Sequence, residues 1–174
     1  MPGEPLVELV EEVDDGGRAV RVVTRAEMRA GNLRHRSVGI VVRHPVDPTI
    51  LVHRRAGWKD VWPGRWDICF GGVCGVGEPE VESARRELAE EAGVEVDAGD
   101  LQPLGSGSYE DDDVRAFATV FEVRSEGPFT FADGEVEEVR WLPIADLEAF
   151  LATHPHCPDS AALVRSIRPW GNER

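Results

Sequence analysis

The chain has 174 residues, of which 41% are hydrophobic and 30% charged, as expected for one globular domain with a sizeable core. Its 33 acidic and 19 basic residues give a net charge of −14, which argues against a nucleic-acid-binding surface. A small phosphorylated ligand remains compatible with this charge, because bound divalent cations reverse the local sign.

Cysteine usage and the absence of long apolar runs indicate a cytoplasmic protein. Cys69, Cys74 and Cys157 match neither a disulfide framework nor a zinc-ligand spacing, so we expect a reducing compartment. The acidic opening lacks the basic and apolar regions of a signal peptide. No apolar run approaches the length of a membrane span, so we expect no membrane partner.

The first 31 residues predict a hairpin followed by a short helix. Residues 6–13 and 18–23 are predicted strands around an Asp-Asp-Gly-Gly turn. Thr24 and Glu27 have the spacing of a capping box for a helix that ends near Gly31. We expect this extension (1–31) to lengthen the sheet or to form a homodimer interface, rather than to bind a ligand.

Residues 38–42 and 49–54 predict the next two strands, with a Pro-containing loop between them. Arg54 and Arg55 end the second strand, where they either reach a phosphate or are simply solvated, and the sequence favours neither. His35 and His53 are interpreted as structural or surface residues rather than catalytic ones.

Residues 56–66 form a predicted loop with three tryptophans. Trp58 and Lys59 could wall a pocket for a flat or hydrocarbon group. The alternative, favoured for at least two of the tryptophans, is that they hold the loop against the body. Residues 66–70 then predict a strand.

Residues 72–94 carry the strongest pattern in the chain, G-x5-E-x7-R-E-[apolar]-x-E-E-x-G-[apolar]. A chance match is on the order of 10⁻⁷ at average residue frequencies. Pro79 suits the first turn of a helix and Gly93 its C-terminal end.

Three glutamates on this predicted helix lie on one side, because they are three and four residues apart: Glu87, Glu90 and Glu91. An apolar stripe lies roughly 110° away around the helix, comprising Val81, Ala84, Leu88 and Ala92. Clustered carboxylates repel one another unless a cation lies between them, and oxygen ligands suit Mg²⁺ or Mn²⁺. A metal site is therefore favoured over a solvated acidic face.

The last third predicts more strands and two helices. Strands are expected at 101–109, 114–124, 129–131 and 139–142, with an acidic turn at 110–113. A helix at 144–152 should follow Pro143, and a second at 160–167 should carry Arg165 and Arg168 near its C-terminal end.

The pattern at 72–94 resembles the signature of the Nudix hydrolases without a substitution, and the resemblance extends over about 34–151. It implies a single domain (1–174) of α/β (α+β) class, an α/β/α sandwich with a mixed sheet. It also implies metal-dependent hydrolysis of the pyrophosphate linkage in a nucleoside diphosphate derivative, with Mg²⁺ or Mn²⁺ as cofactor and a small-molecule pyrophosphate substrate.

The same resemblance implies roles for individual residues. Glu87, Glu90 and Glu91 would be catalytic metal ligands, joined by the Gly72 carbonyl, while Glu78 and Arg86 would form a supporting ion pair. The residue that activates water varies in this family. Helix carboxylates, Glu137, Glu138 and the turn 110–113 therefore remain open alternatives.

A narrower resemblance distinguishes two reactions. LRHRSVGIVV (33–42) and HRRAGWKDVWPGRWDICFGG (53–72) resemble the Nudix branch that contains isopentenyl-diphosphate isomerases. Alignment through WPGxW places the isomerase's catalytic cysteine and metal-binding histidine at Gly71 and Val73, so both functional side chains are missing. We interpret the chain as a hydrolase, with an isomerase-like enzyme or a non-catalytic binding module as the alternatives.

Overall fold

The central strand of the sheet is β3 (His35–Arg43), whose apolar residues are buried on both faces. The computed structural model describes residues 6–167, 169 and 170. Because side chains alternate along a strand, Val38, Ile40 and Val42 pack on one side of the sheet and Val41 on the other. The continuous β-branched run in the sequence therefore corresponds to a strand between two layers.

The sheet is mixed and has nine strands among the described residues. β3 pairs in parallel with β8 (Arg115–Arg124), and antiparallel with β6 (Phe70–Val73) and with the start of β4 (Thr49–Arg55). The other neighbours are antiparallel: β7 (Gln102–Glu110) on β8, and β5 (Trp66–Asp67) and β9 (Val136–Pro143) on β4. β6 thus lies directly beside the central strand.

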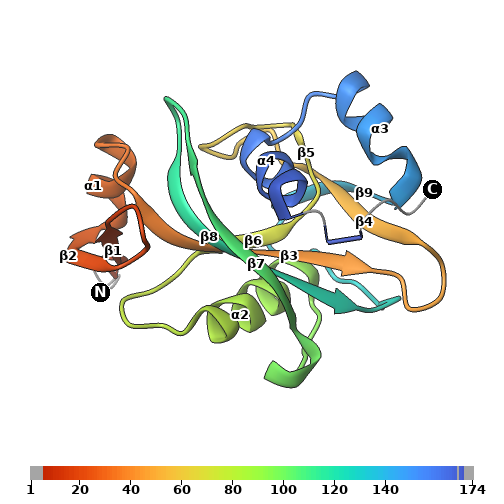
Figure 1. Ribbon diagram of the computed structural model, residues 1–174, viewed down its shortest axis with the longest axis horizontal. Coiled ribbons are helices and arrows are strands. Elements are labelled where there is room, and N and C mark those ends of the chain that lie inside the picture. The colour runs from red at the N-terminus through yellow and green to blue at the C-terminus, as the bar shows by residue number, and fades with distance from the viewer. Residues whose placement is uncertain (1–5, 168, 171–174) are drawn as a thin grey trace, which may run out of the picture.

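Helices cover the two faces of the sheet and complete an α/β/α sandwich (Figure 1). Helix α2 (Glu80–Ala92) lies on one face and buries Ala84, Leu88 and Ala92 of the predicted stripe. Helices α3 (Leu147–Thr153) and α4 (Pro158–Ile167) lie on the other. Two 3₁₀ turns, Ala98–Asp100 and Ile144–Asp146, precede β7 and α3. The predicted fold class is confirmed.

The first elements form a unit that we call the N-terminal module: β1 (Leu9–Val13), β2 (Ala19–Thr24) and α1 (Arg25–Ala30). It lies at one end of the sheet (Figure 1). β1 pairs with β3 through Glu12 and His35, so the module lengthens the sheet as expected. Both hydrogen bonds of the Thr24–Glu27 capping box are present.

Several predicted elements differ from the structure. The expected strand 66–70 is two short strands, because the Cys69 amide donates to Asp67 Oδ1 and turns the chain between them. The expected strand 129–131 is a loop, in which the Thr130 amide donates to the carbonyl of Ala92 and covers the end of α2.

The two C-terminal helices also differ in detail from the prediction. The helix expected at 144–152 begins with a 3₁₀ turn, and α4 starts two residues before the expected 160. Arg165 pairs with Glu148 of α3 at 2.7 Å, and Arg168 lies outside the described residues. No helix in the described part of the chain is both long and apolar enough to cross a membrane.

Gly71 in β6 is the glycine with the least room. Its φ is +152°, and a Cβ there would lie 2.0 Å from the carbonyl oxygen of Val38. We expect Gly71→Ala to lower the free energy of unfolding by at least about 2 kcal/mol, through backbone strain and displacement of β3. Urea denaturation followed by circular dichroism measures this.

The matched control is Gly64→Ala. Gly64 also has a positive φ, +71°, but nothing lies within 4 Å of its Cβ position. This variant should lose only about 1 kcal/mol. Equal losses in the two variants would contradict the steric argument.

Candidate active site

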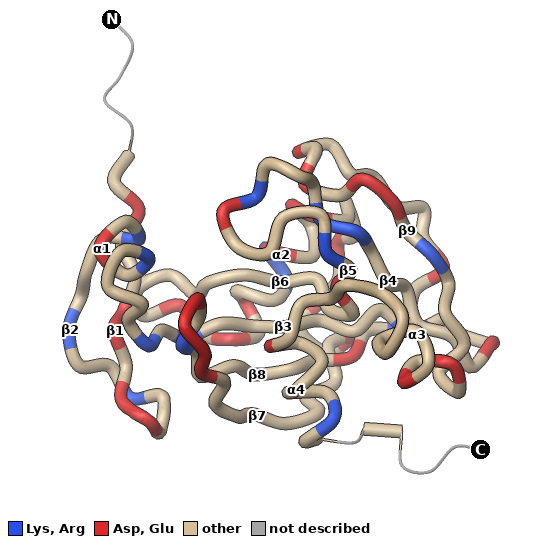
Figure 2. Tube along the Cα trace, turned by 90° about the horizontal axis from the view of Figure 1, so that it is seen from above, with Lys and Arg blue, Asp and Glu red and all other residues tan. Residues whose placement is uncertain are grey.

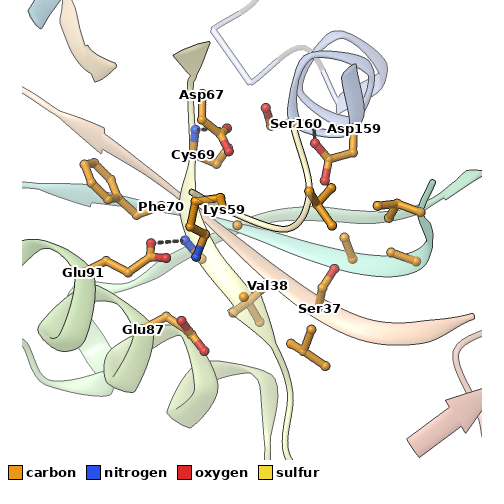
Figure 3. Close-up of a pocket in the computed structure, with 18 of the residues that line it drawn as sticks. Ser37, Val38, Lys59, Asp67, Cys69, Phe70, Glu87, Glu91, Asp159 and Ser160 are labelled. Carbon is orange, nitrogen blue, oxygen red and sulfur yellow. Dashed lines mark hydrogen bonds between the residues drawn. The ribbon is translucent and has the colours of Figure 1, made fainter. Parts of the chain in front are cut away.

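Helix α2 is placed so that one side packs and the other faces β6. It begins after Pro79 and ends at Gly93, whose φ of +67° is the left-handed conformation that closes many helices. Since Leu88 and its apolar neighbours face the sheet core, Glu87 and Glu91 project toward the backbone of β6 (Figure 3). Helix and strand together therefore define the geometry of both carboxylates.

Glu91 is held by the backbone of the adjacent strand. The Gly71 amide donates to Glu91 Oε2 at 2.9 Å, and only 9% of the residue is exposed. Burial raises the pKa of Glu91 to about 8, with the nearby charge of Glu87 adding to the shift and the Gly71 hydrogen bond opposing it. The anionic form thus lacks a sufficient counter-charge.

Glu87 occupies the space that a side chain at position 72 would need. A Cβ on Gly72 would lie 2.7 Å from the Glu87 carboxylate. Burial raises the pKa of Glu87, although Arg86 Nη1 lies 2.6 Å from its Oε1 and opposes the shift. The Glu87 carboxylate can therefore occupy this position only because residue 72 has no side chain.

Arg86 connects the helix to the loop before it. Its guanidinium contacts both carboxylate oxygens of Glu78, each at 3.0 Å, and donates to the Val73 carbonyl at 3.3 Å. Glu78 also accepts the Gly75 amide at 2.8 Å. The hydrogen bonds from Arg86 are the main reason why the pKa of Glu78 is lowered. This network holds the glycine-rich loop against α2.

Glu90 is more exposed than the other two glutamates. Its carboxylate contacts Arg86 Nη1 at 3.4 Å, and 60% of its side chain is accessible. Within the described ranges, no three Asp, Glu, His or Cys side chains are close enough to enclose a metal ion. Arg86 Nη1 lies against both Glu87 and Glu90.

The residues present nevertheless fit a hard divalent cation. Burial raises the pKa of both Glu87 and Glu91, the charge of Glu90 adds to the shift at Glu87, and the charge of Glu87 adds to the shift at Glu91. A cation between such buried acids would stabilise them. The donors are all oxygens, which suit Mg²⁺ or Mn²⁺. The bare backbone at Gly72 leaves room for close approach.

A cavity of about 340 Å³ opens in front of these carboxylates. Figure 3 shows Glu87 and Glu91 at one end, Asp159 and Ser160 at the other, and Lys59 between them. The apolar part of the wall comes mainly from the central strands and α4: Val38, Ala116, Ala118, Val120 and Leu163. The cavity therefore offers charged ends and an apolar surface to one ligand.

The end of the cavity away from α2 contains a second pair of acids. Burial raises the pKa of Asp159 to about 7, the charge of Asp67 adds to this, and Arg55 opposes it. Arg55 Nη1 lies 3.9 Å from Asp67 Oδ2, and Arg55 Nε donates to the Val61 carbonyl. Hydrogen-bond donors and acceptors are thus both available at this end.

Two of the four residues singled out as substrate contacts line the cavity. Arg55 and Lys59 do so, and Lys59 Nζ lies 2.6 Å from Glu135 Oε2. Arg54 instead pairs with Glu137 at 3.0 Å and is not among the lining residues. Trp58 is 65% exposed and does not line the cavity either.

The tryptophans and the candidate bases also divide into residues that line the cavity and residues that do not. Trp62 and Trp66 are buried and hold their loop, as favoured from the sequence. Neither Glu138 nor the turn 110–113 lines the cavity; Glu138 pairs with Arg140, and Asp111 accepts the amides that close its own turn. The cavity instead contains Glu135, a lining residue that the sequence did not single out.

The N-terminal module also reaches the cavity, which corrects the expectation that it is remote from ligands. Arg25 and Arg29 of α1, with Glu8, lie in the lining. No sequence signal indicated this, because the contact depends on how β1 joins β3.

The chain belongs to the Nudix family. The family model described as the NUDIX domain matches residues 33–166. An uncharacterized Nudix hydrolase of Escherichia coli K12, YfcD, is 39% identical over 143 residues, 82% of this chain and 77% of that protein. One from Streptomyces coelicolor is 36% identical over 169 residues, covering 94% and 90%.

A solved structure supports the same assignment. DR0079 from Deinococcus radiodurans aligns with a TM-score of 0.77 at 29% identity, over 92% of this chain and 99% of that one. The protein is thus a Nudix pyrophosphohydrolase, a member of a family that generally uses divalent metals such as Mg²⁺.

The raised pKa of Glu91 predicts a pH-dependent stability for the metal-free protein. Between the ordinary carboxyl value of 4.5 and about 8, the folded state keeps a proton that the unfolded state has lost. The free energy of unfolding should therefore fall as the pH rises through this window. Glu91→Gln should remove this loss and raise the melting temperature in EDTA by several degrees at pH 8, and by little at pH 5.

Glu90→Gln is the control, because this substitution removes the same charge from a largely exposed position on the same helix. Its melting temperature relative to wild type should vary little between pH 5 and pH 8. If Glu91→Gln followed the wild-type curve at every pH, burial of an uncompensated carboxylate would be the wrong explanation.

Proposed function

We propose that the protein hydrolyses the pyrophosphate linkage of a nucleoside diphosphate derivative in a reaction that requires Mg²⁺ or Mn²⁺. The observation that carries this proposal is the buried pair Glu87 and Glu91 beside the bare backbone of Gly71 and Gly72. This pair stands at one end of a cavity that Arg55 and Lys59 also line.

Glu87, Glu90, Glu91 and the Gly72 carbonyl would hold the cation. When bound, it neutralises charge that develops on the diphosphate and lowers the pKa of the attacking water. Arg86 keeps the loop and helix in register through Glu78. Lys59 and Arg55 present N–H donors to phosphate oxygens, and phosphoryl transfer depends mainly on such positioning and charge neutralisation.

A carboxylate must accept the proton of the attacking water. Three glutamates of α2 (Glu87, Glu90 and Glu91) line the cavity, as does Glu135, whereas Glu137 and Glu138 do not. The lining supports a base on α2 or at Glu135. No Ser or Cys nucleophile is needed, and Cys69 and Cys74 are both buried thiols whose pKa burial raises.

The isomerase alternative has less support. It requires a cysteine at position 71, where a Cβ would lie 2.0 Å from a backbone oxygen. A non-catalytic binding module is also disfavoured, because it would have no use for a buried pair of uncompensated acids.

The function is tested by hydrolysis of nucleotide sugars, dinucleotides and nucleoside di- and triphosphates. We expect turnover with Mg²⁺ or Mn²⁺, none in EDTA, and recovery when metal is added back. Glu87→Gln should lower kcat about 10²-fold, the scale for loss of a metal ligand. Glu82→Gln, on the exposed side of the same helix, is the control. Full turnover in a metal-stripped sample would reject the proposal.

The two enzymatic alternatives are separated by incubation with isopentenyl diphosphate in heavy water. Since position 71 has no side chain, we expect no deuterium in the recovered diphosphate by mass spectrometry. Cys69→Ala and Cys74→Ala should leave hydrolysis essentially unchanged. Deuterium incorporation that is lost in either cysteine variant would favour the isomerase instead.

A further inference from the structure

Helix α1 contributes positive charge to the cavity from outside the matched Nudix region. The family match begins at residue 33, whereas α1 spans Arg25–Ala30. Both of its arginines line the cavity. In Figure 2 the basic residues of α1 and those beside β5 both lie toward the β6 side of the central strands. The lining therefore includes cations that a Nudix domain alone would lack.

Arg29 has little to balance its charge. Its side chain is 26% exposed, and its Nε is covered and has no hydrogen-bond partner among the described residues. The nearest carboxylate oxygen, Asp60 Oδ2, lies 3.5 Å away on a side chain that is 59% exposed. A covered N–H donor without a partner is costly unless a ligand accepts a hydrogen bond from it.

The surrounding charges also favour an anion at this place. Burial lowers the pKa of Arg29; Asp60 opposes the shift, and the positive charges of Arg25 and Arg55 add to it. Arg25 pairs with Glu8 at 2.9 Å and is close enough to Glu87 to oppose the rise in that residue's pKa. Three arginines thus crowd around one cavity, an arrangement that an anionic ligand would stabilise.

We propose that Arg29, assisted by Arg25, binds an unesterified terminal phosphate of the substrate. This inference rests on the function proposed above and specifies its substrate class as nucleoside di- or triphosphates rather than diphosphates esterified at both ends. A terminal phosphate carries more charge and more acceptor oxygens than a bridging one. The planar guanidinium of Arg29 suits it, because arginine can donate two parallel hydrogen bonds to a phosphate.

The test compares ADP with ADP-ribose, which differ in whether the second phosphate is free. Their affinities are measured by isothermal titration calorimetry in EDTA, so that binding is read without turnover. Wild type should bind ADP more tightly than ADP-ribose. Arg29→Gln should weaken ADP binding about tenfold and ADP-ribose binding less than about twofold, on the scale of one charged hydrogen bond.

Two further variants control the comparison. Arg21→Gln removes the same charge from an exposed position in β2 that does not line the cavity, and should leave both affinities unchanged. Arg29→Lys keeps the positive charge but lacks the planar guanidinium, so its affinity for ADP should lie between those of wild type and Arg29→Gln. It also replaces the Gln variant if that variant does not fold. Circular dichroism checks the fold of each.

The result separates this inference from the function itself. Equal losses for the two ligands, a loss in Arg21→Gln as large as in Arg29→Gln, or no preference of wild type for ADP would overturn the inference. None of these outcomes would affect metal-dependent hydrolysis of a doubly esterified diphosphate. Conversely, absence of any metal-dependent hydrolysis would reject the function while the calorimetry still reported on Arg29.

Discussion

The contact between the Gly71 amide and Glu91 is the one on which the site depends. It joins the last turn of α2 to β6, at a place where neither Gly71 nor Gly72 has a side chain. A Cβ at Gly71 would collide with β3, and one at Gly72 would collide with Glu87. The helix, the short strand and the central strand therefore constrain one another through two glycines.

The buried carboxylates near this contact have lost their hydration, and basic side chains around the cavity partly replace it. The chain carries a net charge of −14, yet the cavity is surrounded by basic side chains that partly offset its buried carboxylates. Arg86 pairs with both Glu78 and Glu87, and Lys59 pairs with Glu135. Glu87 and Glu91 remain undercompensated at one end of the cavity, and Arg29 remains so in the wall that α1 contributes. Both features suit the metal–phosphate ligand that we propose.

The N-terminal module gives this Nudix domain a wall that residues 33–166 do not supply. Its attachments to the body include the paired residues Glu12 and His35, the hydrogen bond from the Val13 amide to the Arg34 carbonyl, and the ion pair between Arg36 and Glu11 at 2.9 Å. Its own core is small, built around Val10, Val23 and Met28. A compact unit fixed at the edge of the cavity can change which ligands fit without altering the helix that carries the carboxylates.

The sequence by itself determined the local features: the capping box of α1, the start and end of α2, its apolar stripe, and the shared side of Glu87 and Glu91. These depend on spacing along one element, which helical geometry converts directly into direction. It mistook residues 129–131 for a strand, since aromatic residues that cover a helix end have the same composition as a strand. The position of Arg29, the exclusion of Trp58 and Arg54 from the cavity, and the place of Glu135 were decided only by tertiary structure. Each depends on which residues far apart in the chain come together across the sheet, and the spacing of residues along the chain does not determine those distances.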